Sequence, residues 1–160
     1  MTKRWLGLSI AVGLVFILAV PGCTDFQAAV NAYNRGEYET ALKKFLPLAE
    51  QGHAGAQHYL GVMYGEGKGV PQDYAEAMKW YRLAAEQGDA DAQYNLGGMY
   101  FSGHGVARNH IQAYMWVTLA AAQGNKNAVI GLEILEKKMT SSQIAEAQRL
   151  AREWRPKSAE

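Results

Sequence analysis

The feature that most constrains this chain is an internal repeat of 36 residues. Residues 51–86 and 87–122 are identical at 17 of 36 aligned positions, far more than chance allows. Each copy opens with Gln-Gly-x-Ala-x-Ala-Gln-x-x-Leu-Gly-x-Met-Tyr, continues with Gly-x-Gly-Val and closes with Ala-x-x-Trp-x-x-Leu-Ala-Ala. Two apolar-periodic runs joined by glycines predict a helix–turn–helix unit, which buries its apolar face by stacking on neighbouring units.

Incomplete units flank the two full copies. Residues 26–50 read as a degenerate N-terminal helical repeat, in which Pro47 is expected to kink or loosen the end of the second helix. Residues 123–154 carry a partial repeat and a last helix that opens with Thr140-Ser-Ser-Gln143, a capping-box signature. We expect this helix to cap the array and residues 155–160 to fray.

Equivalent positions in the copies predict how the helices begin and pack. The second helix of each full unit is expected to start at a capping residue, Asp73 or Asn109, with Glu or Gln three positions on completing a capping-box pattern. Gly61 and Gly97 would let two helices approach closely. Their equivalent in the third unit is Glu133, so no further unit is expected to pack there in the same way.

Aromatic and aliphatic side chains recur at helical spacing. Trp80 and Trp116 occupy one position in successive copies, and Leu83 and Leu119 lie on the same predicted face. This pattern favours core packing over a ligand site.

Composition fits one globular domain and gives no sign of nucleic-acid binding. The chain is 49% hydrophobic and 19% charged. Setting aside Lys3 and Arg4 of the N-terminal segment, the 16 basic residues become 14, against 15 acidic residues. No basic stripe appears within the repeats, so nucleic acid is not an expected partner.

Residues 1–22 have the pattern of a secretory signal peptide. A short basic lead precedes a 16-residue uncharged run, Trp5 to Val20, and a small-residue exit at Pro21-Gly22. The run is shorter than the roughly 20 residues that a membrane-spanning helix needs. We therefore expect an exported, periplasmic protein; the alternative is a retained signal segment that anchors the chain in the membrane.

The only cysteine of the chain lies at the exit of this segment. Val20-Pro21-Gly22-Cys23 resembles the bacterial lipobox, except that proline replaces the usual small residue. The resemblance implies that Cys23 is lipidated as the mature N-terminus, that residues 23–25 are a short linker, and that the protein is sorted to the outer membrane. Ordinary signal cleavage is the alternative, and it would leave a free thiol in an oxidising compartment, where unpaired cysteines are uncommon.

No pattern of catalytic or metal-binding residues stands out. Gly65-Glu-Gly-Lys-Gly69 lacks the preceding strand and the Gly-Lys-Ser/Thr ending of a phosphate loop, so a structural turn is the better interpretation. The four histidines lack the i, i+4 spacing of a metal pair. No serine or cysteine has a nucleophile-elbow context, and no carboxylate pair recurs. We expect no enzyme activity, cofactor or metal.

The positions that differ between the copies gather on one stripe of the first helix of each unit. Their offsets of 3, 4 and 7 residues place them on one side, so packing fixes the other side. In a solenoid the free side of the first helices normally lines the concave surface. This predicts a partner-binding groove. The alternative is a solvent-facing surface whose residue types vary between the copies without functional constraint. The predicted groove residues are His58, Tyr59, Val62, Tyr94 and Asn95.

The repeated motifs resemble those of Sel1-like repeats (SLR), relatives of tetratricopeptide repeats (TPR), over residues 26–154. The resemblance implies an all-α fold: an α-solenoid, wound as a right-handed superhelix of stacked helix–turn–helix repeats, with a C-terminal capping helix. It also implies a non-enzymatic scaffold or adaptor of the bacterial cell envelope that binds a protein or peptide partner. Some bacterial members act in secretion, exopolysaccharide export or host interaction.

One alternative from the same resemblance is a cell-envelope hydrolase. Cysteine-rich relatives have been associated with β-lactam binding or hydrolysis, and they carry paired cysteines in each repeat. This chain has no cysteine in its repeats. The alternative is therefore disfavoured.

Overall fold

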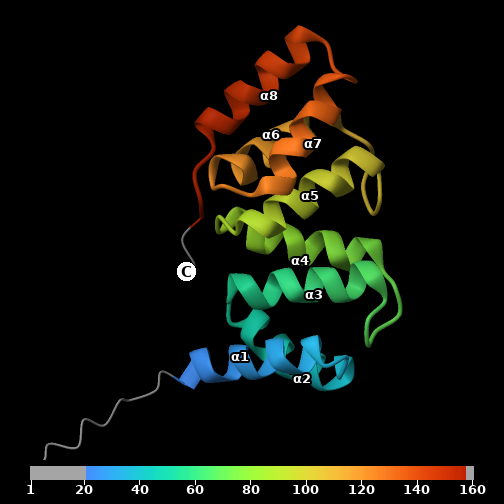
Figure 1. The fold of residues 1–160 in the computed structure, drawn as a ribbon, viewed down its shortest axis with the longest axis vertical. Coiled ribbons are helices and arrows are strands. Elements are labelled where there is room, and N and C mark those ends of the chain that lie inside the picture. The colour runs from blue at the N-terminus through green and yellow to red at the C-terminus, as the bar shows by residue number, and fades with distance from the viewer. Residues whose placement is uncertain (1–20, 158–160) are drawn as a thin grey trace, which may run out of the picture.

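The computed structural model describes residues 21–157, which form eight helices and no strand. The helices are α1 (Pro21–Asn34), α2 (Tyr38–Glu50), α3 (Ala54–Glu66), α4 (Tyr74–Glu86), α5 (Ala90–Ser102), α6 (His110–Ala122), α7 (Lys126–Glu136) and α8 (Ser141–Glu153). From α1 to α7, consecutive helices pack against each other in an elongated stack (Figure 1). The expected all-α solenoid is confirmed.

The N-terminal expectations fall mostly outside this range. Residues 1–20 of the predicted signal peptide lie outside the described residues. Helix α1 begins at Pro21, so the expected linker at residues 23–25 is part of a helix. Within residues 21–157, no helix combines the length and the apolar character that crossing a membrane requires.

Polar side chains fix where the helices begin. His53, Asp89 and Asn125 occupy equivalent positions before α3, α5 and α7, and each accepts a hydrogen bond from the backbone N–H three residues on. Asp73 and Asn109 cap α4 and α6 as expected. These bonds satisfy N–H groups that the first turn of a helix leaves unpaired.

The reciprocal capping box forms at α8 but not at α4. Thr140 Oγ1 accepts from the Gln143 N–H at 3.3 Å, and Gln143 Oε1 accepts from the Thr140 N–H at 2.9 Å. At α4 the Glu76 N–H donates to Asp73, but the Glu76 carboxylate pairs with Lys79 at 3.3 Å instead of reaching back. The nearby ammonium offers the carboxylate a charged partner one turn further along the helix.

Proline does not interrupt α2. The helix continues through Pro47 to Glu50, so the expected loosening of its last turns is not seen. Pro47 and Lys43, whose carbonyl loses the i+4 donor, are both exposed, and water can solvate that carbonyl. The Gln51 N–H still donates to the Pro47 carbonyl at 3.2 Å.

Glycines allow the two helices of each full unit to lie close together. A Cβ atom on Gly61 would lie 2.5 Å from Cδ1 of Tyr81, and one on Gly97 would lie 2.6 Å from Cγ2 of Val117. The predicted close approach is confirmed. Glu133, at the equivalent place on α7, is exposed.

The glycine loops join the two helices within each full unit. Gly69 and Gly105 have φ angles of 73° and 71°, a region that favours glycine. A Cβ on Gly69 would lie 2.8 Å from Cβ of Tyr38, and Gly105 lies equally tightly against the Tyr74 backbone. The interpretation of these loops as structural turns is confirmed, since each loop packs against the start of the preceding unit's second helix.

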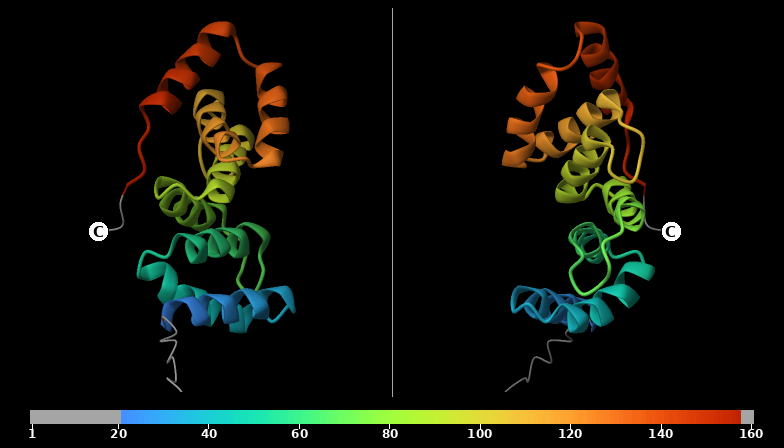
Figure 2. Two further views of the ribbon diagram at one scale, coloured as in Figure 1. Left: turned by 60° about the vertical axis from the view of Figure 1, so that its left-hand side comes forward. Right: turned by 90° about the vertical axis from the view of Figure 1, so that its right-hand side faces the viewer.

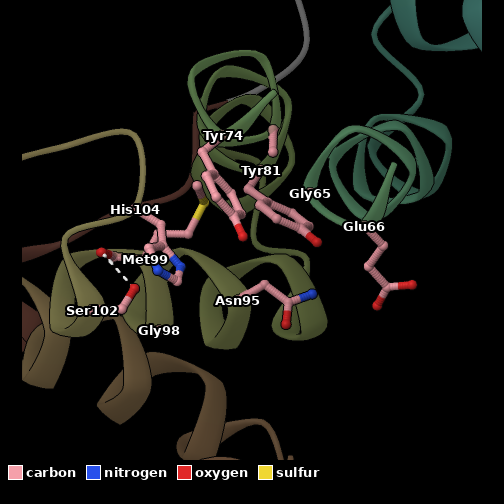
Figure 3. A pocket seen from close by; sticks show the side chains of 10 residues that line it. Gly65, Glu66, Tyr74, Tyr81, Asn95, Gly98, Met99, Ser102 and His104 are labelled. Atoms are coloured by element: carbon pink, nitrogen blue, oxygen red, sulfur yellow. Dashed lines mark hydrogen bonds between the residues drawn. The ribbon is translucent and has the colours of Figure 1, made fainter. Parts of the chain in front are cut away.

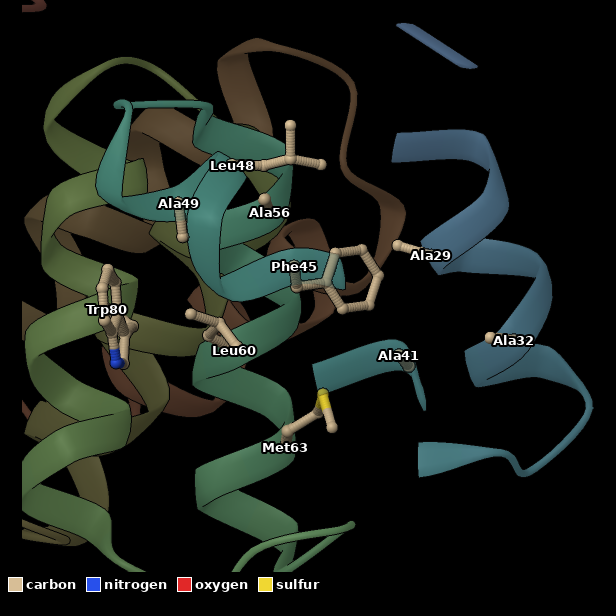
Figure 4. Close-up of a cluster of buried hydrophobic side chains, with 10 residues drawn as sticks. All are labelled: Ala29, Ala32, Ala41, Phe45, Leu48, Ala49, Ala56, Leu60, Met63 and Trp80. Atoms are coloured by element: carbon tan, nitrogen blue, oxygen red, sulfur yellow. The ribbon is translucent and has the colours of Figure 1, made fainter. Parts of the chain in front are cut away.

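The core consists of three clusters of buried side chains along the stack. Figure 4 shows the first, which α1, α2 and α3 form with Trp80 of α4. Trp80 and Trp116 are 8% and 7% exposed, so their core assignment is confirmed. Leu83 was expected on the same face but is 39% exposed. The buried residues of α4 lie on an arc through Ala77, Tyr81 and Ala84 that leaves position 83 outside.

Buried glutamines link the layers. Gln57 Nε2 donates to the carbonyl of Ala49 at 3.0 Å, and one unit later Gln93 Nε2 donates to the carbonyl of Ala85 at 3.2 Å. Both carbonyls lie in the last turn of the preceding helix, where carbonyl groups have no N–H donor within the helix. The equivalent position in the third unit is Val129, so the series ends at α7.

The end of the array departs from the repeat. Helices α7 and α8 both pack against α6 and diverge from each other (Figure 2), so α8 does not cover α7 as α4 covers α3. Three aliphatic side chains of α7 are about half exposed. They are Val129, Ile130 and Ile134, at 51%, 59% and 47%.

The chain after α8 returns to α4. The backbone N–H of Lys157 donates to the Glu86 carbonyl at 2.7 Å, and its Nζ lies 2.8 Å from Oε2 of Glu86. The Trp154 ring stands edge-on to Trp116 with centroids 6.0 Å apart. The expected fraying is therefore wrong for residues 155–157, because these contacts hold them.

Candidate partner-binding surface

The structure brings two of the predicted groove residues together. Asn95 Nδ2 of α5 lies 3.1 Å from Nε2 of His58 on α3. With His58 neutral, the imidazole nitrogen accepts from the amide. Burial lowers the pKa of His58 below its usual value, against the opposing effect of Asp89 and Asp91. The contact therefore orients the Asn95 amide.

Tyr59 belongs to the packing of the first layers. Its ring stacks on Phe45 with centroids 4.7 Å apart and an interplanar angle of 10°, and it meets Phe26 and Tyr33 edge-on. Burial raises the pKa of the Tyr59 hydroxyl. Val62 is half-buried against the second core cluster. These two side chains contribute mainly to stability.

An apolar cavity of about 300 Å³ lies between α5, α6 and α7. Tyr94 and Asn95 of the predicted groove line it, together with Gly97, Gly98, Phe101, Val117, Gly131, Ile134 and Leu135. Glycines make up a third of this lining, so little side-chain volume fills the space. The cavity can receive an apolar side chain without displacing the core.

A second cavity, of about 230 Å³, lies where α5 meets α3 and α4, and it is more polar. Figure 3 shows Tyr74, Tyr81, Asn95, Ser102 and His104 around it. The Tyr74 ring stacks on His104 with centroids 4.5 Å apart, and burial strongly raises the pKa of Tyr81. This lining presents hydroxyl, amide and imidazole groups to any ligand.

Asn95 and Gly98 line both cavities. The two residues are three positions apart on α5 and therefore lie on the same side of the helix. Gly98 is exposed, and a Cβ there would meet no atom within 4 Å. We call this surface, with its two cavities and with Tyr94, Asn95, Gly98 and Phe101 on α5, the α5 face.

Comparison of the two copies does not point to Phe101 or Ile134 of the α5 face, nor to Ile130 beside it. Phe101 and Ile134 line the apolar cavity, and the exposed Ile130 lies one turn before Ile134 on α7. A signal was present, because Ile130 and Ile134 fall 36 residues after Tyr94 and Gly98. The stripe of differing positions therefore continues from α5 onto α7 of the partial third unit.

The described residues hold no group of three His, Cys, Asp or Glu side chains arranged to bind a metal ion. The histidines there have other contacts: His53 caps α3 and stacks on Phe26, and His104 stacks on Tyr74. The α5 face offers a concave shape, apolar area and hydrogen-bonding groups, and these are the features with which a protein binds a partner.

Comparison with protein families gives two matches, both to the Sel1 repeat, at residues 54–89 and 90–125. The matched units start three residues after those inferred from the internal identity, at the first residues of α3 and α5. A comparison with curated proteins gives no match.

Two solved structures resemble this one. A protective antigen present in uropathogenic Escherichia coli strains, which displays an SLR fold, is 31% identical, with a TM-score of 0.79 over 83% of this chain and 29% of its own. A Sel1 repeat protein from Oxalobacter formigenes is 29% identical, with a TM-score of 0.67 over 82% of this chain and 55% of its own. The chain thus spans less than a third of the first relative and about half of the second.

Proposed function

Because this chain carries two Sel1 repeats in an SLR fold, we propose that it is an adaptor of the bacterial cell envelope that binds a protein partner on its α5 face. Sel1 repeats form a scaffold for protein–protein interaction and are generally non-catalytic.

The observation that carries the binding role is the contrast between two neighbouring glycines. Gly97 lies against Val117, where a side chain would collide, whereas Gly98 faces open space between two cavities. Packing explains Gly97 but does not explain Gly98. A bare helix surface beside an apolar cavity lets the backbone of a partner approach closely.

Export and anchoring are supported by the N-terminal sequence. The basic lead, the uncharged run and the lipobox-like Cys23 favour a lipoprotein of the periplasm. The mass of the mature N-terminal peptide, isolated from bacterial membranes, tests this proposal. We expect a lipidated Cys23 and, for Cys23→Ser, loss of the lipid mass. An unmodified terminus at another residue would contradict lipidation.

In-cell photo-crosslinking tests the binding surface. A photoreactive phenylalanine analogue replaces Tyr94 on the α5 face or, as a matched control, Ala145, which is exposed on α8 and lines neither cavity. We expect a crosslinked product of one constant mass from position 94 only. Equal products from both positions, or none from position 94, would contradict the assignment of the α5 face.

A further inference from the structure

We propose that the apolar cavity between α5 and α7 binds a large aliphatic or aromatic side chain of a short peptide segment that carries a carboxylate beside that residue. This inference rests on the proposed binding function and names the chemistry of the partner. Three features of the cavity and its rim carry it: apolar walls, an open path for a backbone, and a lysine at one end.

The walls of the cavity are suited to an apolar anchor. Phe101 and Tyr94 contribute ring surface from α5, and Ile134 contributes aliphatic surface from α7. Ile134 is 47% exposed, and Ile130, one turn earlier on α7, is 59% exposed. A bound apolar side chain would cover surface that the fold leaves in water, and such burial favours binding in proportion to its area.

A peptide backbone has room to cross α5 beside the cavity. Gly98 presents no side chain there, and the neighbouring Asn95 amide carries both a donor and an acceptor. The hydrogen bond to His58 uses the Asn95 Nδ2 side, so its Oδ1 can accept from a peptide N–H. One polar group at the edge of an apolar cavity fixes the orientation of a ligand.

The positive charge at the rim of the apolar cavity indicates that the bound peptide carries an acidic residue beside its apolar anchor. Lys138 Nζ lies 6.0 Å from the Phe101 ring centroid, and no carboxylate of residues 21–157 pairs with it within 4 Å. Lys137 precedes it and is also exposed. Glu133 of α7 is exposed, and Glu136 accepts a hydrogen bond from the Tyr114 hydroxyl at 2.9 Å. A carboxylate next to the anchor would therefore meet positive charge.

The exposed area favours a short segment over a second folded copy of this chain. Standard protein interfaces bury roughly 800 Å² on each partner. Val129, Ile130 and Ile134, each about half exposed, together offer far less apolar surface. The cavity of about 300 Å³ is at the lower end of the range for small-ligand sites, which suits one anchoring side chain.

Phage display of random decapeptides on the purified protein tests the inference. We expect enrichment of Leu, Ile, Met or Phe directly beside Asp or Glu, and the enriched peptide, synthesised with a fluorescent label, is then titrated. Gly98→Phe should weaken its binding at least tenfold, because the ring blocks the path beside the cavity. Lys138→Glu should weaken it about two- to fivefold, as expected of a charge at the rim of an interface.

Controls separate binding from folding and from self-association. Circular dichroism and urea unfolding of both variants check that the fold is retained, and Ala145→Phe on α8 should bind as the wild type does. The inference would be overturned by enrichment of peptides that lack the apolar–acidic pair, or by equal affinity of the peptide for the wild type and Gly98→Phe. It would also be overturned if the protein formed concentration-dependent dimers that Gly98→Phe abolished. If photo-crosslinking from position 94 still yields a partner, the proposed function stands; if that product is also missing, both fall.

Discussion

Gln123 donates a hydrogen bond to the buried side-chain oxygen of Gln93 over 2.8 Å, repeating one unit later the bond of 2.7 Å from Gln87 to Gln57. Each buried glutamine also donates to a carbonyl of the preceding helix. One side chain thus connects three successive helices. A buried amide is stable only when its donors and acceptors are paired, so these bonds fix the spacing of the layers.

Gln93→Leu should destabilise the protein by about 1–3 kcal/mol, because the Ala85 carbonyl and the Gln123 amide lose their partner while the volume stays similar. Gln123→Ala is the matched control. Gln123 is exposed, so this change should cost no more than about 0.5–1.5 kcal/mol. Urea unfolding followed by circular dichroism measures both; an equal loss in the two variants would show that the burial of Gln93 does not matter.

Gly97→Ala and Gly98→Ala should change stability in opposite directions. A Cβ on Gly97 would lie 2.6 Å from Val117 and 3.0 Å from the Ala113 carbonyl, and overpacking of this kind costs about 1–3 kcal/mol. A Cβ on Gly98 meets nothing within 4 Å, so alanine should stabilise α5 by up to about 1 kcal/mol. The midpoint of thermal unfolding checks the pair. Destabilisation by Gly98→Ala would indicate a packing role that the structure lacks.

Truncation after Glu153 should lower stability by about 1–3 kcal/mol. It removes the hydrogen bond from Lys157 to the Glu86 carbonyl and the edge-on contact of Trp154 with Trp116. Lys157→Met keeps the backbone bond and removes only an exposed ion pair, so its effect should be small. Urea midpoints compare the two. A truncated chain as stable as the full one would mean that this segment does not hold α4.

Stability should fall as the pH is lowered through the usual pKa of His58. Burial lowers the pKa of His58 below 6.5 in the folded chain. On acidification the unfolded chain therefore takes up a proton first, and stability is lost until the pH has passed the folded pKa. His58→Gln keeps an acceptor for Asn95 but cannot titrate. Between about pH 7.5 and pH 5.5 its urea midpoint should drop less than that of the wild type; equal drops would exclude His58 as the source.

The repeat and its packing residues could be predicted from sequence, because residues that pack between helices are identical in the two copies. Gly61 and Gly97 were recognised from position alone, and the structure gives the contacts that require them. Gln57 and Gln93 were seen as identical positions, but their bonds to Ala49 and Ala85 depend on where the preceding helix ends. Such a bond between layers has no local sequence pattern.

The candidate site could be predicted only in part. The stripe of differing residues on α3 and α5 predicts one side of each helix that packing leaves free. It cannot show that Tyr59 stacks on Phe45 while Tyr94 lines a cavity. That difference arises because α1 fills the space beside Tyr59, whereas no helix covers α7 at the other end of the array.

Identical positions hold the layers together, and we propose that the α5 face binds a partner. Formaldehyde crosslinking in cells, followed by purification of the wild type and of Gly98→Phe, tests it most directly, with urea midpoints measured for both proteins. We expect Gly98→Phe to lose the crosslinked partner and to keep its stability, because position 98 faces open space. Undiminished capture by a folded Gly98→Phe protein would contradict it.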